Sequence, residues 1–169
     1  MAGGARGRPA AEARVVRLLP GQGSMPMQFK VVPGELREPG DPIAAIQATL
    51  RRYPQAQAEG TAHRVSVAPL NAEGFRVAFT DRGGRYRVDC DGWHAEFRDA
   101  TLAIGCFTSA LSPKCRLKVW RRGGEAYSWE LQTLSEGNWA SVGAVTNWLI
   151  PFWRPREIVI LQNRLLEAA

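Results

Sequence analysis

The densest group of chemically reactive side chains in the sequence lies between residues 89 and 94. This run reads Asp-Cys-Asp-Gly-Trp-His, so it combines a thiol, two carboxylates and an imidazole. A thiolate near a helix N-terminus has a lowered pKa, and a histidine four residues later could act as its base or join it as a metal ligand. The pattern therefore raises the hypothesis of a thiol-dependent enzyme that uses Cys90, His94 and Asp91.

The same run also has a purely structural interpretation, which we favour. Cys90 would end a strand as a small apolar residue, Asp91 would cap the next helix, and His94 would lie on the helix surface. The chain has two histidines and no CxxC or HxxxH pattern to complete a ligand set, so we predict no metal site and no cofactor. We therefore expect a protein that is not an enzyme.

A second candidate site is the aromatic run at residues 147–156, Asn-Trp-Leu-Ile-Pro-Phe-Trp-Arg-Pro-Arg. Its apolar surface must be buried in the fold or against a partner. One alternative is that this segment supplies the hydrophobic mass on which the sheet closes. The other is that Trp148, Phe152 and Trp153 bind a protein or a small apolar ligand, with Arg154 and Arg156 as the polar rim.

Nucleic-acid binding is a further alternative, because basic residues interleave with aromatic ones. Lys118, Arg121 and Arg122, for example, lie around Trp120. A basic and aromatic sheet face can hold single strands by stacking and charge. However, the alternation of a one-sided sheet by itself sends aromatic side chains inward and arginines outward. We therefore rank this function below a non-catalytic binding or protein-interaction module.

The charge of the chain is concentrated at its beginning. Residues 1–24 hold four arginines against one glutamate, which accounts for half of the net charge of +6. This stretch is rich in Gly, Ala and Arg, so we expect a disordered basic tail, or a translation start at Met25 or Met27 that would exclude it. Residues 25–169 then form one domain.

The elements that would position these residues follow from periodicity. Apolar spacings of three and four predict helices at 42–53, 93–111 and 156–167, although the β-branched residues of 156–166 equally suit a strand. Alternating stretches predict strands at 63–68, 75–80, 85–90, 115–121, 126–133 and 139–143, with another strand from 146 to 152 and a short lead-in strand at 28–32.

The predicted fold is α+β: a single domain with a twisted, mainly antiparallel sheet of six to eight strands and about three helices. Two Arg-Gly-Gly hairpins about forty residues apart suggest two similar halves, each a helix followed by three strands. No apolar run is long enough to span a membrane, and three cysteines without CxxC pairing fit reduced thiols. We therefore expect a cytoplasmic protein.

Overall fold

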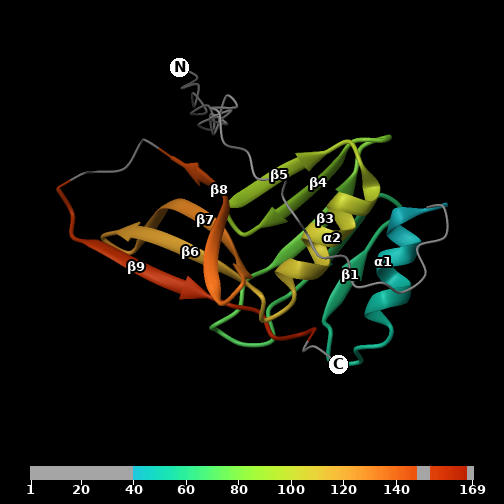
Figure 1. Ribbon diagram of the computed structural model, residues 1–169, viewed down its shortest axis with the longest axis horizontal. Helices are drawn as coiled ribbons and strands as arrows, with labels where there is room; N and C mark the ends of the chain where they lie inside the picture. Colours follow the sequence, from blue (N-terminus) through green and yellow to red (C-terminus); the bar gives the residue numbers. More distant parts are fainter. Residues whose placement is uncertain (1–39, 148–152, 167–169) are drawn as a thin grey trace, which may run out of the picture.

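Two antiparallel sheets organise the part of the chain that the computed structural model describes, residues 40–147 and 153–166 (Figure 1). The first sheet has five strands in chain order, β1 to β5, and the second has four strands in the order β8-β7-β6-β9. The prediction of an α+β fold with antiparallel strands is confirmed. The prediction of one sheet with six to eight strands is wrong, because nine strands divide between two sheets.

The first helix, α1 (Pro42–Leu50), begins where the sequence predicted. The Asp41 carboxylate accepts a hydrogen bond from the Ile43 backbone N–H at 2.9 Å, and Pro42 occupies the first helical position. Ile43, Ile46 and Leu50 are buried against the first sheet. The helix ends three residues earlier than predicted.

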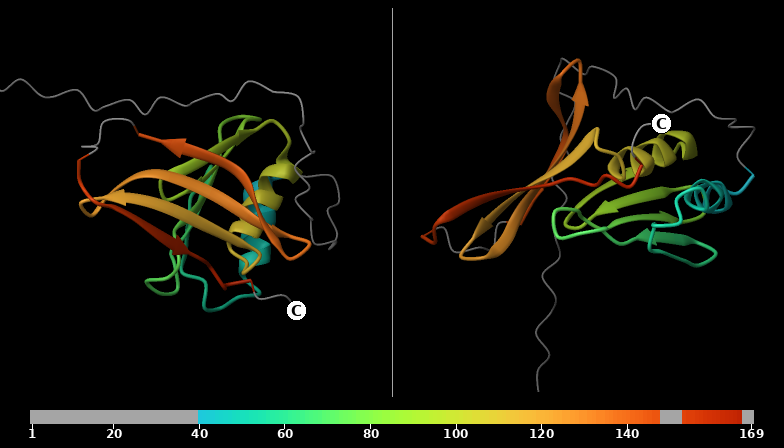
Figure 2. Two further views of the ribbon diagram at one scale, coloured as in Figure 1. Left: turned by 60° about the vertical axis from the view of Figure 1, so that its left-hand side comes forward. Right: turned by 90° about the horizontal axis from the view of Figure 1, so that it is seen from below.

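The first sheet is a meander, and its central hairpins match the predicted strands. Its members are β1 (Ala58–Gly60), β2 (Arg64–Val67), β3 (Val77–Asp81), β4 (Tyr86–Cys90) and β5 (Trp93–Phe97). Gly83 and Gly84 turn the chain between β3 and β4 with φ angles of 69° and 85°, which a side chain with Cβ adopts only under strain. Both helices cover the same side of this sheet (Figure 2).

The predicted helix at 93–111 is wrong in its first half. Asp91 and Gly92 form a two-residue turn between β4 and β5, with Asp91 at φ 48°, instead of opening a helix. The helix α2 (Ala100–Ala110) begins only after Asp99, whose carboxylate accepts from the Leu102 N–H at 2.9 Å. The Asp-Gly pair was therefore a hairpin signal.

The second sheet replaces the predicted C-terminal helix with a strand. Its members are β6 (Cys115–Arg122), β7 (Glu125–Ser135), β8 (Asn138–Thr146) and β9 (Arg156–Leu161). The β-branched run Ile158, Val159 and Ile160 pairs with β6, opposite Trp120, Val119 and Lys118. The helix at 156–167 is therefore a wrong prediction.

The two parts of the chain are not equal halves. Five strands follow α1, whereas β6, β7, β8 and β9 follow α2. Two tryptophans join the sheets: the Trp129 indole lies over Gly92, and Trp93 Nε1 donates to the Gly143 carbonyl at 3.0 Å. The prediction of two helix-plus-three-strand repeats therefore fails.

The residues after β9 pack where the end of α2 meets the loop before β3. Asn163 is buried, and its side chain bonds the N–H and carbonyl of Phe75 and the carbonyl of Ala110 at 2.9 to 3.1 Å. Leu165 is buried beside it, and the Leu166 N–H donates to the Leu111 carbonyl. This segment, rather than a helix, anchors the end of the chain.

The hydrophobic core lies mainly between the first sheet and the two helices. The ring of Phe79 in β3 packs edge-on against the ring of Phe107 in α2, with 6.2 Å between the ring centres. Leu117 and Leu131 extend the core to the second sheet.

Of the aromatic run at 147–156, Trp153 is 74% exposed, while Trp148 and Phe152 lie outside the described residues. Residues 1–24 and the predicted strand at 28–32 also lie outside them. Neither α1 nor α2 is long and apolar enough to cross a membrane.

Candidate functional site

The thiol and the imidazole of the proposed enzyme site lie on opposite faces of the first sheet. Cys90 pairs with Trp93 across the β4–β5 hairpin and is fully buried, whereas His94 pairs with Asp89 and shares the other face. Asp91 lies in the turn between them and is exposed. The structure therefore does not bring Cys90 and His94 together as a nucleophile and its base.

The three cysteines are buried thiols. Burial raises the pKa of Cys90 well above its usual value, with a further increase from the neighbouring Cys106 and Cys115. Burial also raises the pKa of Cys106, and raises the pKa of Cys115 to about 12. Within residues 40–147 and 153–166, no three His, Cys, Asp or Glu side chains gather as a metal site.

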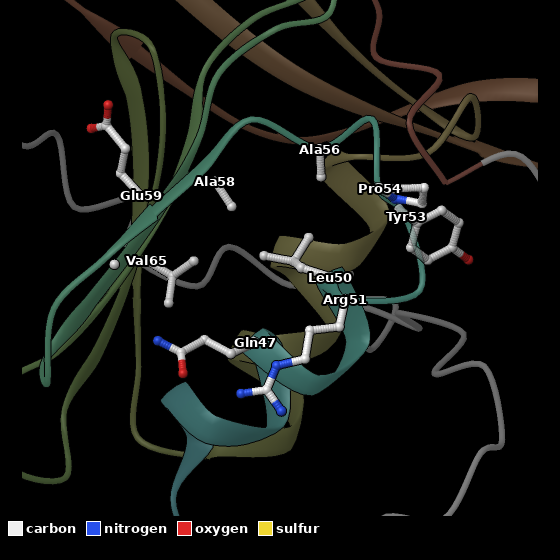
Figure 3. Close-up of a pocket in the computed structure, with 10 residues that line it drawn as sticks. Gln47, Leu50, Arg51, Tyr53, Pro54, Ala56, Ala58, Glu59 and Val65 are labelled. Atoms are coloured by element: carbon white, nitrogen blue, oxygen red, sulfur yellow. The ribbon is translucent and has the colours of Figure 1, made fainter.

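A shallow depression lies between α1 and the first sheet (Figure 3). It encloses about 340 Å³ and has an apolar floor that includes Leu50, Ala58 and Val65. Figure 3 shows the Glu59 side chain pointing away from Gln47 and Arg51. Since these polar groups do not converge, the depression offers no set of catalytic groups.

The most distinctive surface is the solvent-facing side of the second sheet, which we call the outer face. Residues of β6 alternate between the two sides of this sheet: Cys115, Leu117 and Val119 are buried in the core with residues of the first sheet and α2. The outer face includes the intervening residues of β6 and neighbours on the other three strands, among them Arg116, Lys118, Trp120, Arg122, Glu125, Tyr127, Ser128, Glu130, Gln132, Leu134, Trp139, Arg156, Ile158 and Ile160. In Figure 2 the helices and the first sheet lie on the other side of these four strands.

Four contacts between a cation and an aromatic ring lie on the outer face. The Arg116 guanidinium is 4.2 Å from the centre of the Trp139 ring, and that of Arg122 is 5.5 Å from the centre of the Tyr127 ring. The Trp120 ring has Lys118 Nζ at 4.8 Å and the Arg156 guanidinium at 5.8 Å from its centre. Each ring is thus electrostatically matched to at least one cation.

A β-bulge places Tyr127 on this face. Strict alternation would put Tyr127 on the same side as Trp129 and Leu131. The register of β6 and β7 shifts between Trp120 and Arg121, so that Tyr127 is the extra residue and its ring meets Arg122. Bulges commonly re-aim a side chain in this way.

Aliphatic side chains extend the outer face on both sides. Ile158 and Ile160 of β9 are 49% and 45% exposed, and Leu134 of β7 is 40% exposed. These residues flank the row of cations along β6. The outer face thus combines charge, flat rings and exposed apolar surface, which are the ingredients of a recognition surface.

Two of the predicted ligand-binding residues lie at or near this surface, and Trp148 and Phe152 are outside the described residues. Arg156 belongs to the outer face, and the Arg154 carbonyl accepts a hydrogen bond from Arg122 at 3.1 Å near one end of it. Trp153 is exposed next to them. The sequence pattern had marked Lys118 and Arg122 around Trp120, but it did not show that Trp139 and Tyr127 share their face, because that depends on register.

Comparison of the chain with known protein families, with curated proteins and with solved structures found no match.

Proposed function

We propose that this protein is a non-catalytic binding module whose contact surface is the outer face. The observation that carries the proposal is the set of four cation–aromatic contacts on one solvent-facing sheet. Arginine and aromatic residues dominate the binding energy of macromolecular interfaces, because they combine a large contact area with directional polar groups.

The shape of this surface supports a macromolecular ligand. The outer face is a sheet surface that extends across four strands, whereas small molecules bind in concave pockets that enclose most of their area. The depression beside α1 is open and is lined by residues of α1 and the first sheet, not of the outer face. An extended ligand would cover the exposed Ile158, Ile160 and Leu134 together with the cations.

The buried thiols do not support the enzyme alternative. A catalytic cysteine needs an accessible thiolate, but burial raises the pKa of Cys90 and keeps the thiol protonated. His94, the candidate base in the same run, lies on the opposite face of the sheet from Cys90. We therefore assign no catalytic role to Cys90, Asp91 or His94.

The proposal is tested by reversing charge on the outer face. The purified full-length protein is immobilised, exposed to cell extract, and the retained protein and nucleic acid are quantified separately. The Lys118→Glu/Arg156→Glu variant should retain about tenfold less of the specific ligand, a loss of about 1.4 kcal/mol. Arg64→Glu/Arg85→Glu, exposed positions in β2 and in the β3–β4 turn, is the matched control and should retain as much as the wild type. Equal retention by both variants would contradict the proposal.

A further inference from the structure

We propose that the outer face binds single-stranded nucleic acid, with bases stacked on Trp139 and Tyr127 and phosphates held by Lys118, Arg156 and the flanking arginines. This inference rests on the proposed binding function and names its ligand class. It is carried by the placement of rings and cations on one exposed face.

The aromatic rings are the first step. In a sheet that is covered on one side only, aromatic side chains normally pack inward and charged ones face solvent. Here Trp120 shares the outer side of β6 with Arg116 and Lys118, and the bulge turns Tyr127 to the same side. Rings on an exposed sheet face offer stacking platforms for unpaired bases.

The cations are the second step, because three of them rest against aromatic rings. The ion pairs Arg87–Asp89 at 2.8 Å and Arg82–Glu96 at 3.7 Å lie on the first sheet and its β3–β4 turn. On the outer face, Arg116, Lys118 and Arg156 lie over aromatic rings, and Arg116 Nε also donates to Gln132 Oε1 at 2.7 Å. A cation–aromatic contact at an exposed site is worth only about 0.5–1 kcal/mol, so a phosphate can draw Lys118 and Arg156 away from the Trp120 ring at little cost.

The layout of these groups is the third step. The row along β6 from Arg116 to Arg122 spans roughly 20 Å, which accommodates several nucleotides. Trp139 lies beside Arg116 toward one end, and Tyr127 lies beside Arg122 at the other. Trp120 lies between them and supports both Lys118 and Arg156. The two end rings are therefore the stacking platforms, and Lys118 and Arg156 lie between them.

The repeat of ring and cation favours nucleic acid over an acidic protein segment. Every nucleotide brings one phosphate and one planar base, whereas the carboxylates of an acidic peptide do not come paired with flat apolar groups. A duplex would offer its phosphates but would hide the faces of its bases. Rings and charges on this face do not read base edges, so we expect weak sequence preference.

The test is fluorescence anisotropy of the full-length protein with labelled oligothymidylate and oligouridylate of about 15 nucleotides. Both should bind at low salt, and a blunt duplex of the same length should bind at least about fivefold more weakly. The logarithm of the affinity should fall with the logarithm of the salt concentration, with a slope of about −0.7 for each phosphate contact.

Variants assign the binding to the outer face. Trp139→Leu should weaken binding about tenfold, while Trp139→Phe, which keeps a stacking ring, should recover most of it. Lys118→Gln should reduce the salt slope by about one contact. Arg64→Gln, an exposed arginine of the first sheet, is the matched control and should bind like the wild type.

The outcomes separate this inference from the function on which it rests. If neither oligonucleotide binds at low salt, or if Trp139→Leu and Lys118→Gln bind like the wild type, the inference is wrong. Binding of the duplex as tightly as the single strands would also contradict it. If the oligonucleotides fail but protein is still retained through Lys118 and Arg156 in the charge-reversal experiment, the ligand is a protein and the binding function stands.

Discussion

The Trp129 indole lies directly over Gly92, at the joint between the two sheets. A Cβ built on Gly92 would overlap with the ring, so only glycine permits this packing. Trp129 belongs to the inner side of β7, and Gly92 to the turn between β4 and β5. The contact therefore fixes how the second sheet, with its outer face, is held against the first.

Gly92→Ala should destabilise the protein by about 2 kcal/mol or more, because the methyl group displaces the Trp129 ring. Urea unfolding followed by tryptophan fluorescence measures the loss. Gly40→Ala is the control, since a Cβ there meets open space, and should change stability by less than about 0.5 kcal/mol. Combining Gly92→Ala with Trp129→Leu should cost less than the sum of the single changes. Strict additivity would argue against the contact.

Asn163→Leu should cost about 3 kcal/mol of unfolding free energy. The substitution leaves the N–H and carbonyl of Phe75 and the carbonyl of Ala110 without their side-chain partner in a buried site. Thermal and urea unfolding measure this change, and Arg164→Ala at the exposed neighbouring position serves as the control. Similar stabilities for the two variants would show that the Asn163 bonds contribute little.

The native protein should react slowly with thiol reagents at pH 8. Cys90, Cys106 and Cys115 are buried, and burial raises the pKa of each thiol, so little thiolate is present and none of the three is accessible. A disulfide reagent with a coloured product should report no fast phase in native protein and three thiols in denaturant. Rapid modification of Cys90 in the native protein would restore the thiol-enzyme hypothesis.

Stability should fall as the pH drops from about 6.5, and His94 should contribute to this fall. Partial burial of the ring, and then the positive charge of Arg87, lower the pKa of His94 in the folded protein, although Asp89 and Glu96 act in the opposite direction. The unfolded chain therefore takes up the proton first, so the stabilising contribution is complete above about pH 6.5 and is lost toward the lower pKa of the folded state. Urea midpoints between about pH 5 and 8 should depend less on pH in His94→Gln. An unchanged dependence would contradict this assignment.

Local sequence signals predicted much of the first sheet and the start of α1. Asp41 and Pro42 predicted the first residue of the helix, and Gly83 and Gly84 predicted the β3–β4 turn. These features depend on interactions within a few residues, such as a capping hydrogen bond or a positive φ angle. The sequence contains all of that information.

Local sequence patterns gave wrong predictions where the same pattern is compatible with both a helix and a strand or turn. Ile158, Leu161 and Leu165 fit a helical face, yet Ile158 to Leu161 form β9 because β6 offers an unpaired edge and the side chains are β-branched. Asp91-Gly92 fits the start of a helix, but the same pair is also a strong signal for the hairpin turn that joins β4 and β5. In both regions, pairing with a neighbouring strand decided the structure.

The candidate site shows the same division. The sequence by itself determined which residues were available: basic residues beside Trp120, a thiol and an imidazole four residues apart, and alternating strands. Only the tertiary structure decided that Cys90 and His94 face opposite ways, and that Arg116 meets Trp139 while Arg122 meets Tyr127. The physical reason is that side-chain direction in a sheet depends on register, which a single bulge changes and which only the paired strands establish.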